Sequence, residues 1–247
     1  MGVIVITGGS RGIGASAAEQ IAKKGFGVIL TYNANPQAAA SVVHRIEQAG
    51  GKAVALKLDV SDVGSFGAFQ ESVVTTLRQN WDTTKLNGLV NNAGYGLFNP
   101  LATVSEGQFD DLFKVHLKGP FFLTQMLLPL LAKDASIVNL TSATTRVATS
   151  GVAPYAAFKG GLEVLTRYMA KEFGEQRIRA NAVSPGAIRT ELGGGLNDEF
   201  EAMLAAQTAL GRVGEPEDVA RVIAMLLSEE GAWINAQTIE VAGGYNI

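Results

Sequence analysis

Short apolar runs alternate with longer stretches of helical periodicity along the whole sequence. The apolar runs are rich in Val, Ile and Leu, and they cover residues 3–6, 27–32, 52–60, 86–94, 136–142, 177–186 and 237–244. An Ala-rich amphipathic segment follows the first run, and helical patterns recur at about 36–49, 62–79, 105–131, 154–173, 198–206 and 216–227. This alternation predicts a parallel sheet of about seven strands, with helices on both faces and right-handed crossovers between strands.

No linker, repeat or charge block interrupts the alternation, so we expect one doubly wound α/β domain over residues 1–247. Ligands of such sheets bind beyond the carboxyl ends of the strands, near the point where the strand order reverses. The segments to search are therefore 7–14, 32–33, 59–60, 91–94, 141–142 and 184–186.

Composition narrows the classes of function. A formal net charge of -3 argues against a general nucleic-acid binder. The absence of cysteine excludes disulfides, thiolate metal sites and cysteine nucleophiles, and two histidines argue against a histidine-rich metal site, so we expect no metal. The chain enters its first strand directly and has no apolar run long enough for a bilayer, which favours a cytoplasmic protein without a membrane partner.

The segment from Thr7 to Gly14, TGGSRGIG, joins the first strand to the first helix. Backbone N–H groups at a helix N-terminus carry partial positive charge, and they accept an anion if no Cβ blocks its approach. The glycine spacing differs from the common GxGxxG form, and a plain tight turn is the alternative in a chain with 29 glycines. The loop is therefore a candidate phosphate site.

The end of the second strand bears on which nucleotide binds there. In dinucleotide-binding folds an acid at this place binds the ribose hydroxyls of NAD. Here Tyr32 and Asn33 occupy it, without a carboxylate that would repel a 2′-phosphate. Arg11 in the glycine loop could supply a matching charge, the alternative being a solvent-facing arginine. The pattern favours NADP(H) over NAD(H).

Tyr155 and Lys159 lie one turn apart on a predicted helix. A free tyrosine, with a pKa of about 10, is a poor acid–base catalyst near neutrality, and a nearby cation favours its ionised form. Ser142, at the end of a strand, could hydrogen-bond a substrate oxygen. Taken alone, the tyrosine and lysine could equally be a surface pair.

Five motifs occur in order: Thr7-Gly8-x-x-x-Gly12-x-Gly14, Asn91-Asn92-Ala93-Gly94, Ser142 thirteen residues before Tyr155, Lys159, and Pro185-Gly186. Over essentially its whole length the chain thereby resembles the short-chain dehydrogenase/reductase family, and it is most similar to the branch that contains 3-oxoacyl-[acyl-carrier-protein] reductases. The resemblance implies a Rossmann-type domain. It also implies that Tyr155 is the general acid in reduction, that Lys159 binds the nicotinamide ribose and lowers the tyrosine pKa, and that Ser142 orients the carbonyl.

The resemblance further implies a nucleotide site assembled from several strand ends. Its residues would be Gly8, Ser10, Arg11, Gly12, Ile13 and Gly14 in the loop, Tyr32, Asn33, Asp59 and Val60 on the adenosine side, Asn91, Ala93 and Gly94 beside the central sheet, and Tyr155, Lys159, Pro185, Gly186, Ile188 and Thr190 at the nicotinamide end.

One position departs from the family pattern. Family members usually carry a catalytic asparagine in a V-N-x-x-G context, whose main-chain carbonyl holds a water that relays protons to the lysine. The matching stretch here is Val115-His116-Leu117-Lys118-Gly119. His116 is therefore a tolerated substitute, a residue that alters the proton relay and its pH dependence, or the mark of weakened catalysis.

The segment 191–210 carries Gly193, Gly194 and Gly195 before an amphipathic run, which favours a mobile substrate lid over a loop that only contributes solvation. Tyr95, Phe98, Thr144 and Arg146 fall on neighbouring loops and should line the substrate pocket, although Arg146 could equally face solvent. The helices predicted at 105–131 and 154–173 are apolar on several faces. In the family the same helices form a dimer interface within a tetramer, so a homotetramer is expected.

The leading hypothesis is an NADPH-dependent reductase that converts a ketone, of 3-oxoacyl or another carbonyl type, to a secondary alcohol. Its substrate would be a small molecule or be attached to an acyl carrier. One alternative is an NAD(P)-dependent alcohol dehydrogenase that works in the oxidative direction. Another, supported only by His116, is an NADP-binding sensor or scaffold with weak catalysis.

Overall fold

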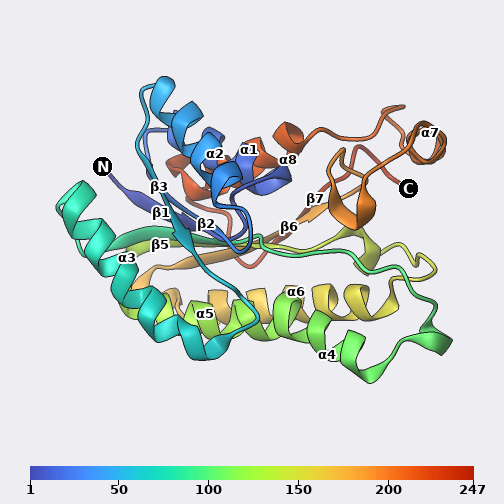
Figure 1. The fold of residues 1–247 in the computed structure, drawn as a ribbon, viewed down its shortest axis with the longest axis horizontal. Coiled ribbons are helices and arrows are strands. Elements are labelled where there is room, and N and C mark those ends of the chain that lie inside the picture. Colours follow the sequence, from blue (N-terminus) through green and yellow to red (C-terminus); the bar gives the residue numbers. More distant parts are fainter.

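The computed structural model describes residues 1–192 and 194–247, and its seven strands form one parallel sheet. The strands are β1 (Val3–Ile6), β2 (Gly27–Tyr32), β3 (Ala53–Lys57), β4 (Leu86–Asn91), β5 (Leu131–Leu140), β6 (Arg179–Pro185) and β7 (Thr238–Val241). They are ordered β3-β2-β1-β4-β5-β6-β7, and each pairs in parallel with its neighbours. The predicted doubly wound sheet is confirmed (Figure 1).

Helices cover both faces of this sheet (Figure 1). One face carries α1 (Gly12–Lys23), α2 (Pro36–Gln48) and α8 (Pro216–Leu227), and the other carries α3 (Phe66–Trp81), α4 (Glu106–Phe113), α5 (Gly119–Leu127) and α6 (Ala153–Glu172). The short helix α7 (Asp198–Ala206) lies beyond the sheet, near the C-terminus of the chain. No helix in the described part of the chain is long and apolar enough to cross a membrane.

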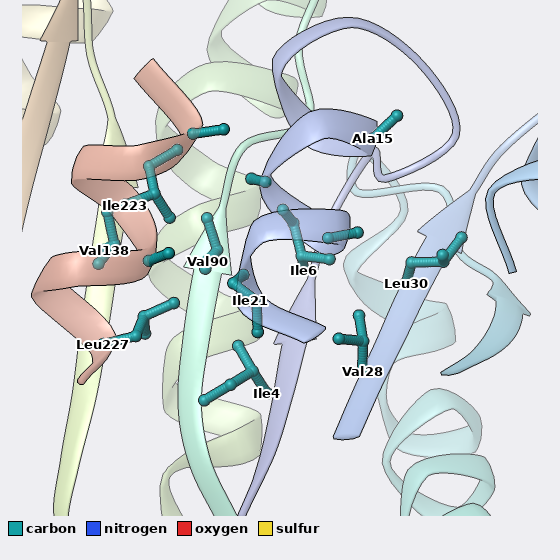
Figure 2. Packing of buried hydrophobic residues seen from close by; sticks show 14 of the residues in the cluster. Ile4, Ile6, Ala15, Ile21, Val28, Leu30, Val90, Val138, Ile223 and Leu227 are labelled. Carbon is teal, nitrogen blue, oxygen red and sulfur yellow. The ribbon is translucent and has the colours of Figure 1, made fainter. Parts of the chain in front are cut away.

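Each face of the sheet is buried by its own apolar cluster, which explains why the strands are nearly continuous apolar runs. On the first face, residues of four adjacent strands pack under α1 and α8, and Figure 2 labels Ile4, Ile6, Val28, Leu30, Val90, Val138, Ile21, Ile223 and Leu227 among them. On the second face, alternate residues of the same strands pack against the other helices, among them Val5, Ile29, Leu89, Ile137, Phe66, Leu77 and Leu123.

The helix predicted at 105–131 is interrupted. A π-helical turn, Lys114–Lys118, separates α4 from α5, and β5 begins at Leu131 rather than at 136. The Gly119 N–H donates to the carbonyl oxygen of Lys114, five residues back, and Pro120 has no N–H to offer to His116. The wider turn therefore accommodates the proline, and it places His116 on the inner side of the helix.

The structure shortens several predicted strands at their carboxyl ends. The run at 86–94 becomes a strand that ends at Asn91, and the run at 52–60 becomes one that ends at Lys57. The residues that follow leave the sheet as loops. Because all strands are parallel, these loops lie at the same edge of the sheet, and this edge holds the candidate site.

Candidate active site

The loop between β1 and α1 is built for close approach of a ligand. Gly8 and Gly12 have positive φ angles of 64° and 53°, and a Cβ on Gly14 would lie 2.2 Å from the carbonyl oxygen of Gly8. The residue before α1, Arg11, makes no side-chain capping bond to the helix. In contrast, α2 is capped by Asn35. The first amides of α1 thus remain available to an anion, and the loop fits the pyrophosphate of a dinucleotide.

Thr7 and Asn92 hold this loop, although they were in the segments to search and not among the predicted nucleotide-binding residues. The Thr7 hydroxyl accepts hydrogen bonds from the backbone N–H groups of Asn92 and Ala93, each at 3.0 Å. The Asn92 side-chain amide donates to the carbonyl oxygens of Thr7 and Gly8, at 2.8 and 3.1 Å. The signal for this role was present, since both residues belong to the motifs already recognised.

The predicted adenosine side lies at the ends of β2 and β3. Burial opposes ionisation of Asp59, but hydrogen bonds from Ser61 and Asn33 and the charge of Lys57 outweigh it, so that the pKa of this carboxyl lies below its usual range. Asp59 is therefore a carboxylate at neutral pH. Val60 is buried next to it.

A cleft of about 590 Å³ opens beside the glycine loop. Its lining includes Ser10, Arg11 and Gly12. The Arg11 side chain is 72% exposed and stands 3.4 Å from the carboxylate of Glu191, a surface pair that contributes little to stability. The guanidinium of Arg11 is consequently available to a ligand in this cleft.

The segment after β6 closes the far side of the loop. A Cβ on Gly186 would lie 2.7 Å from the Cβ of Ala242, and Ile188 forms a parallel bridge with Gly214. The methyl group of Thr190 lies 3.4 Å from the position that a Cβ on Gly12 would take. The structure thus brings Thr190, one of the predicted nicotinamide residues, next to the glycine loop.

Ser142 and Tyr155 are partly exposed at this edge of the sheet, while Lys159 is buried behind them. Ser142 begins the turn after β5, and its hydroxyl accepts hydrogen bonds from the backbone N–H and the hydroxyl of Thr144, at 3.3 and 3.0 Å. The Lys159 ammonium donates to the carbonyl oxygen of Leu140 at 2.6 Å and lies 5.6 Å from the centre of the Tyr155 ring. One buried cation therefore lies beside the two hydroxyl-bearing residues.

Burial governs the ionisation of the tyrosine and the lysine. It raises the pKa of the Tyr155 phenol, an effect that a hydrogen bond with Ser142 opposes in part. It lowers the pKa of Lys159 to about 8. From the sequence we expect Lys159 to lower the pKa of Tyr155. In this structure the effect of burial on that pKa is larger, and the phenol is protonated.

His116 is fully buried, with 1% of its surface exposed. Its Nε2 lies 2.9 Å from the carbonyl oxygen of Tyr95, and its ring stands edge-on to Tyr155, with ring centres 5.0 Å apart. Burial, reinforced by the charge of Lys159 and opposed by the Tyr95 hydrogen bond, lowers the pKa of His116 to about 3. The structure thus joins this residue to a predicted substrate residue and to the predicted acid.

The predicted substrate residues differ in whether their side chains are free to contact a substrate. Tyr95 and Phe98 are exposed on the loop after β4, and Thr144 contacts Ser142. Arg146 is different, because its guanidinium binds both carboxylate oxygens of Glu240, at 2.9 and 2.6 Å, and the backbone carbonyls of Tyr245 and Asn246. A substrate contact would require it to release these partners, so Arg146 is instead the anchor of the C-terminal segment.

The predicted lid contains the turn Leu192–Gly194 and helix α7, which Asn197 caps. Gly194 and Gly195 have positive φ angles, as hinge glycines can, and Gly193 lies outside the described residues. The far end of the lid is tied down, because Asn246 donates its backbone N–H to the carbonyl oxygen of Gln207 at 2.9 Å. The C-terminal segment therefore bridges the lid and Arg146.

The side chain of Asn91 makes its hydrogen bonds inside the protein and not at the open edge of the sheet. Its side-chain amide donates to Asn139 and Thr124, at 2.8 and 3.1 Å, and the Asn139 amide donates to Thr166 at 2.8 Å. This buried chain of hydrogen bonds links β4 and β5 to the helices α5 and α6. It fixes the helix that carries Tyr155 and Lys159 relative to β5, the strand that leads to Ser142.

The sequence of this chain is similar to those of known proteins. A family model described as enoyl-(acyl carrier protein) reductase matches residues 8–246. A 3-oxoacyl-[acyl-carrier-protein] reductase FabG from Staphylococcus aureus (strain Mu50) is 35% identical over 242 residues, which cover 97% of this chain and 96% of that protein.

The fold of this chain is also similar to those of solved structures. The angucycline C-6 ketoreductase LanV with bound NADP has a TM-score of 0.95 at 32% identity, covering 99% of this chain and 95% of that one. A short-chain dehydrogenase/reductase from Serratia marcescens BCRC 10948 has a TM-score of 0.92 at 30% identity, covering 100% and 98%. The chain therefore belongs to the short-chain dehydrogenase/reductase family and is an oxidoreductase that acts on carbonyl or alcohol groups with NAD(P).

Proposed function

We propose that the protein reduces a ketone to a secondary alcohol with NADPH, with Tyr155 as general acid. The observation that carries this proposal is the arrangement of two partly exposed residues with hydroxyl groups, Ser142 and Tyr155, beside the buried Lys159 and at the same edge as the glycine loop. Bound NADPH supplies a hydride to the carbonyl carbon. The chain's own residues hold the carbonyl oxygen and deliver its proton.

Ser142 and Tyr155 would both donate hydrogen bonds to that oxygen, which polarises the carbonyl and stabilises the charge that develops on it. Tyr155 then gives up its phenolic proton. Lys159 stabilises the resulting tyrosinate, because an opposite charge nearby favours the ionised form. The raised pKa keeps the phenol protonated in the free protein, which is the form that a general acid requires.

We expect the substrate to be a ketone whose neighbouring groups bind to an apolar surface. Tyr95 and Phe98 present exposed aromatic side chains on the loop beside the two hydroxyls. The relatives reported above include a 3-oxoacyl-[acyl-carrier-protein] reductase and an angucycline ketoreductase, so both acyl-carrier and aromatic ketones are reasonable substrates to test. Location in the cytoplasm stays a prediction.

Replacing Tyr155 with Phe tests the reaction. The change removes only the phenolic oxygen, so ketone reduction should fall by about a thousandfold or more, since the variant keeps the binding site but loses its acid. The measurement is NADPH oxidation with a panel of 3-oxoacyl and aromatic ketones, and nucleotide binding by fluorescence titration is the control. Undiminished turnover by the variant would exclude Tyr155 as the acid, whereas tight binding with no turnover by the wild type would favour the sensor hypothesis.

We assign the cofactor preference to Arg11. It lines the cleft beside the glycine loop with most of its surface exposed, and neither Tyr32 nor Asn33 brings a carboxylate to the end of β2. A guanidinium binds a phosphate through two hydrogen bonds, which the ribose hydroxyl of NADH does not offer. The preference for NADPH follows from this difference.

The variant Arg11→Ala should bind NADPH about tenfold more weakly or worse, which corresponds to about 1.4 kcal/mol, while its affinity for NADH changes less than about twofold. Fluorescence titration with the two nucleotides measures both constants. Arg78→Ala, an exposed change on α3 at the opposite face of the sheet, is the matched control. Equal weakening of NADPH and NADH binding would contradict the assignment.

The buried ammonium of Lys159 predicts a pH dependence of stability. Its pKa falls from 10.5 to about 8 on folding, so between these values the unfolded chain binds more protons than the folded one. Stability must then rise with pH in this window.

Relative to the variant Lys159→Met, which lacks the titrating group, the free energy of unfolding of the wild type should rise by about 2 kcal/mol from pH 7.5 to pH 9.5. Urea unfolding of both proteins at the two pH values, without nucleotide, gives the difference. Groups common to both proteins cancel. A difference that is constant or falls with pH would show that the ammonium is not desolvated.

We also propose that the chain assembles as a homotetramer. Exposed apolar side chains gather on the outer surfaces of two neighbouring helices, Phe121 and Phe122 on α5 and Val164 and Tyr168 on α6, with Tyr168 62% exposed. A second exposed apolar group, Trp233 at 100% exposure, precedes β7 at the edge of the sheet. Large apolar groups exposed together are typical of protein interfaces.

A charge introduced on the helical surface tests this assembly. Tyr168→Glu should lower the molar mass in solution from four chains to fewer, because a carboxylate buried between apolar surfaces without a partner is costly. Light scattering coupled to size-exclusion chromatography measures the mass. Gln79→Glu, exposed on α3, is the control. A monomeric wild type, or a tetrameric Tyr168 variant, would contradict the proposed interface.

A further inference from the structure

His116 sits between two aromatic rings from different parts of the chain. Its ring centre lies 5.6 Å from that of Tyr95, on the loop after β4, and 5.0 Å from that of Tyr155, on α6. The contact with Tyr155 is edge-on, with the planes 83° apart. His116 therefore packs directly against the predicted acid and against a residue at the mouth of the predicted pocket.

Hydrogen bonding defines the tautomer of this histidine. A backbone carbonyl can only accept, so the 2.9 Å contact with the Tyr95 oxygen requires the proton on Nε2. Nδ1 is buried and has no hydrogen-bond partner among the described residues. A second proton on Nδ1 would be a buried donor without an acceptor, close to the ammonium of Lys159, so the ring is neutral.

The imidazole ring of His116 packs closely against the backbone of a neighbouring loop. A Cβ on Gly94 would lie 2.8 Å from Cε1 of the imidazole and 3.2 Å from Nδ1. His116 itself lies in the π-helical turn Lys114–Lys118, which precedes Pro120. The ring therefore packs closely against the backbone at Gly94 and is held by the Tyr95 carbonyl.

We propose that His116 is a positioning residue, which ties the Tyr95 carbonyl to the flank of Tyr155 through a neutral ring and takes no part in proton transfer. This inference rests on the proposed reduction for its kinetic consequences. By holding Tyr155 from the side, the imidazole keeps the phenol directed at the oxygen of Ser142. By holding Tyr95, it also sets one wall of the substrate pocket.

The surroundings keep the ring neutral throughout the working range of pH. The titratable groups that face it are Tyr95 on its loop and Tyr155 and Lys159 on α6, while Asp111 and Lys114 act on Tyr95 from the α4 side. Burial and the lysine charge hold the pKa of His116 at about 3. Its protonation therefore contributes nothing to a pH–rate profile between pH 5 and pH 9.

Three substitutions separate positioning from proton relay. His116→Gln can still place an amide N–H near the Tyr95 oxygen, and it should keep kcat within about threefold. His116→Phe keeps the ring but loses the donor, and it should lower kcat about tenfold or more and raise KM, because the Tyr95 carbonyl is left unpaired. His116→Asn restores the residue that family members usually carry, whose amide can also donate to a carbonyl, and it should likewise keep kcat within about threefold. All three should retain the pH–rate profile of the wild type.

A spectroscopic test does not depend on activity. The chain has two histidines, so His44→Gln, an exposed change on α2, leaves His116 as the only imidazole. Its ¹⁵N spectrum should show a protonated Nε2 and an unprotonated Nδ1 from pH 5 to pH 9, with no titration. This result would stand even if no ketone were reduced.

The outcomes are distinct. A His116 signal that titrates near pH 6–7, or a proton on Nδ1, would overturn the proposal. So would a pH–rate profile that shifts in both the Gln and the Phe variants, since this is the signature of a proton relay. A Phe variant as active as the wild type would show that the Tyr95 hydrogen bond has no role in turnover.

Discussion

The pairing of β1 with β4 is the interaction on which the site depends. In this register Ile6 lies opposite Val90, and the Thr7 N–H continues the ladder to the carbonyl oxygen of Val90. The glycine loop and the loop after β4 therefore leave the sheet side by side, although they are distant in sequence. The sheet reverses its order at this point, and such a reversal opens the crevice in which ligands of these folds bind.

The second constraint is the burial of a charged group. Lys159 has one carbonyl oxygen, that of Leu140, as its hydrogen-bond acceptor, and its desolvation is unfavourable to the folded state. In the proposed reaction the ammonium, 5.6 Å from the centre of the Tyr155 ring, would stabilise the tyrosinate that forms there. Aliphatic packing at the same place would stabilise the fold but would leave a developing tyrosinate without a counter-charge.

Much of this arrangement could be predicted from the sequence. Strand and helix alternation is a property of local periodicity, and it gave the sheet and its layers correctly. The glycine loop was visible because a positive φ and a close backbone approach require glycine at particular positions, such as Gly8 and Gly14. Parallel strands then place Ser142 and the loops at one edge, whatever the lengths of the connections.

Other features depend on contacts between residues that are distant in sequence, and the local periodicity of the chain does not reveal such contacts. The interruption of the long helix follows from Pro120 together with the close packing of Gly119 against the Val60 carbonyl, which lies far away in sequence. The direction of the Tyr155 pKa shift depends on burial, which a spacing of four residues cannot reveal. Arg146 pairs with Glu240, and only the folded chain brings these two residues together.

The full exposure of Trp233 has a practical consequence for spectroscopy. The protein has two tryptophans, and the other, Trp81, has its indole N–H buried beside Gly27. Emission from an indole in water lies at longer wavelength than emission from one that is shielded by protein. The two fluorophores thus report on different events: Trp81 on the integrity of the sheet, and Trp233 on whatever comes to cover the edge next to β7.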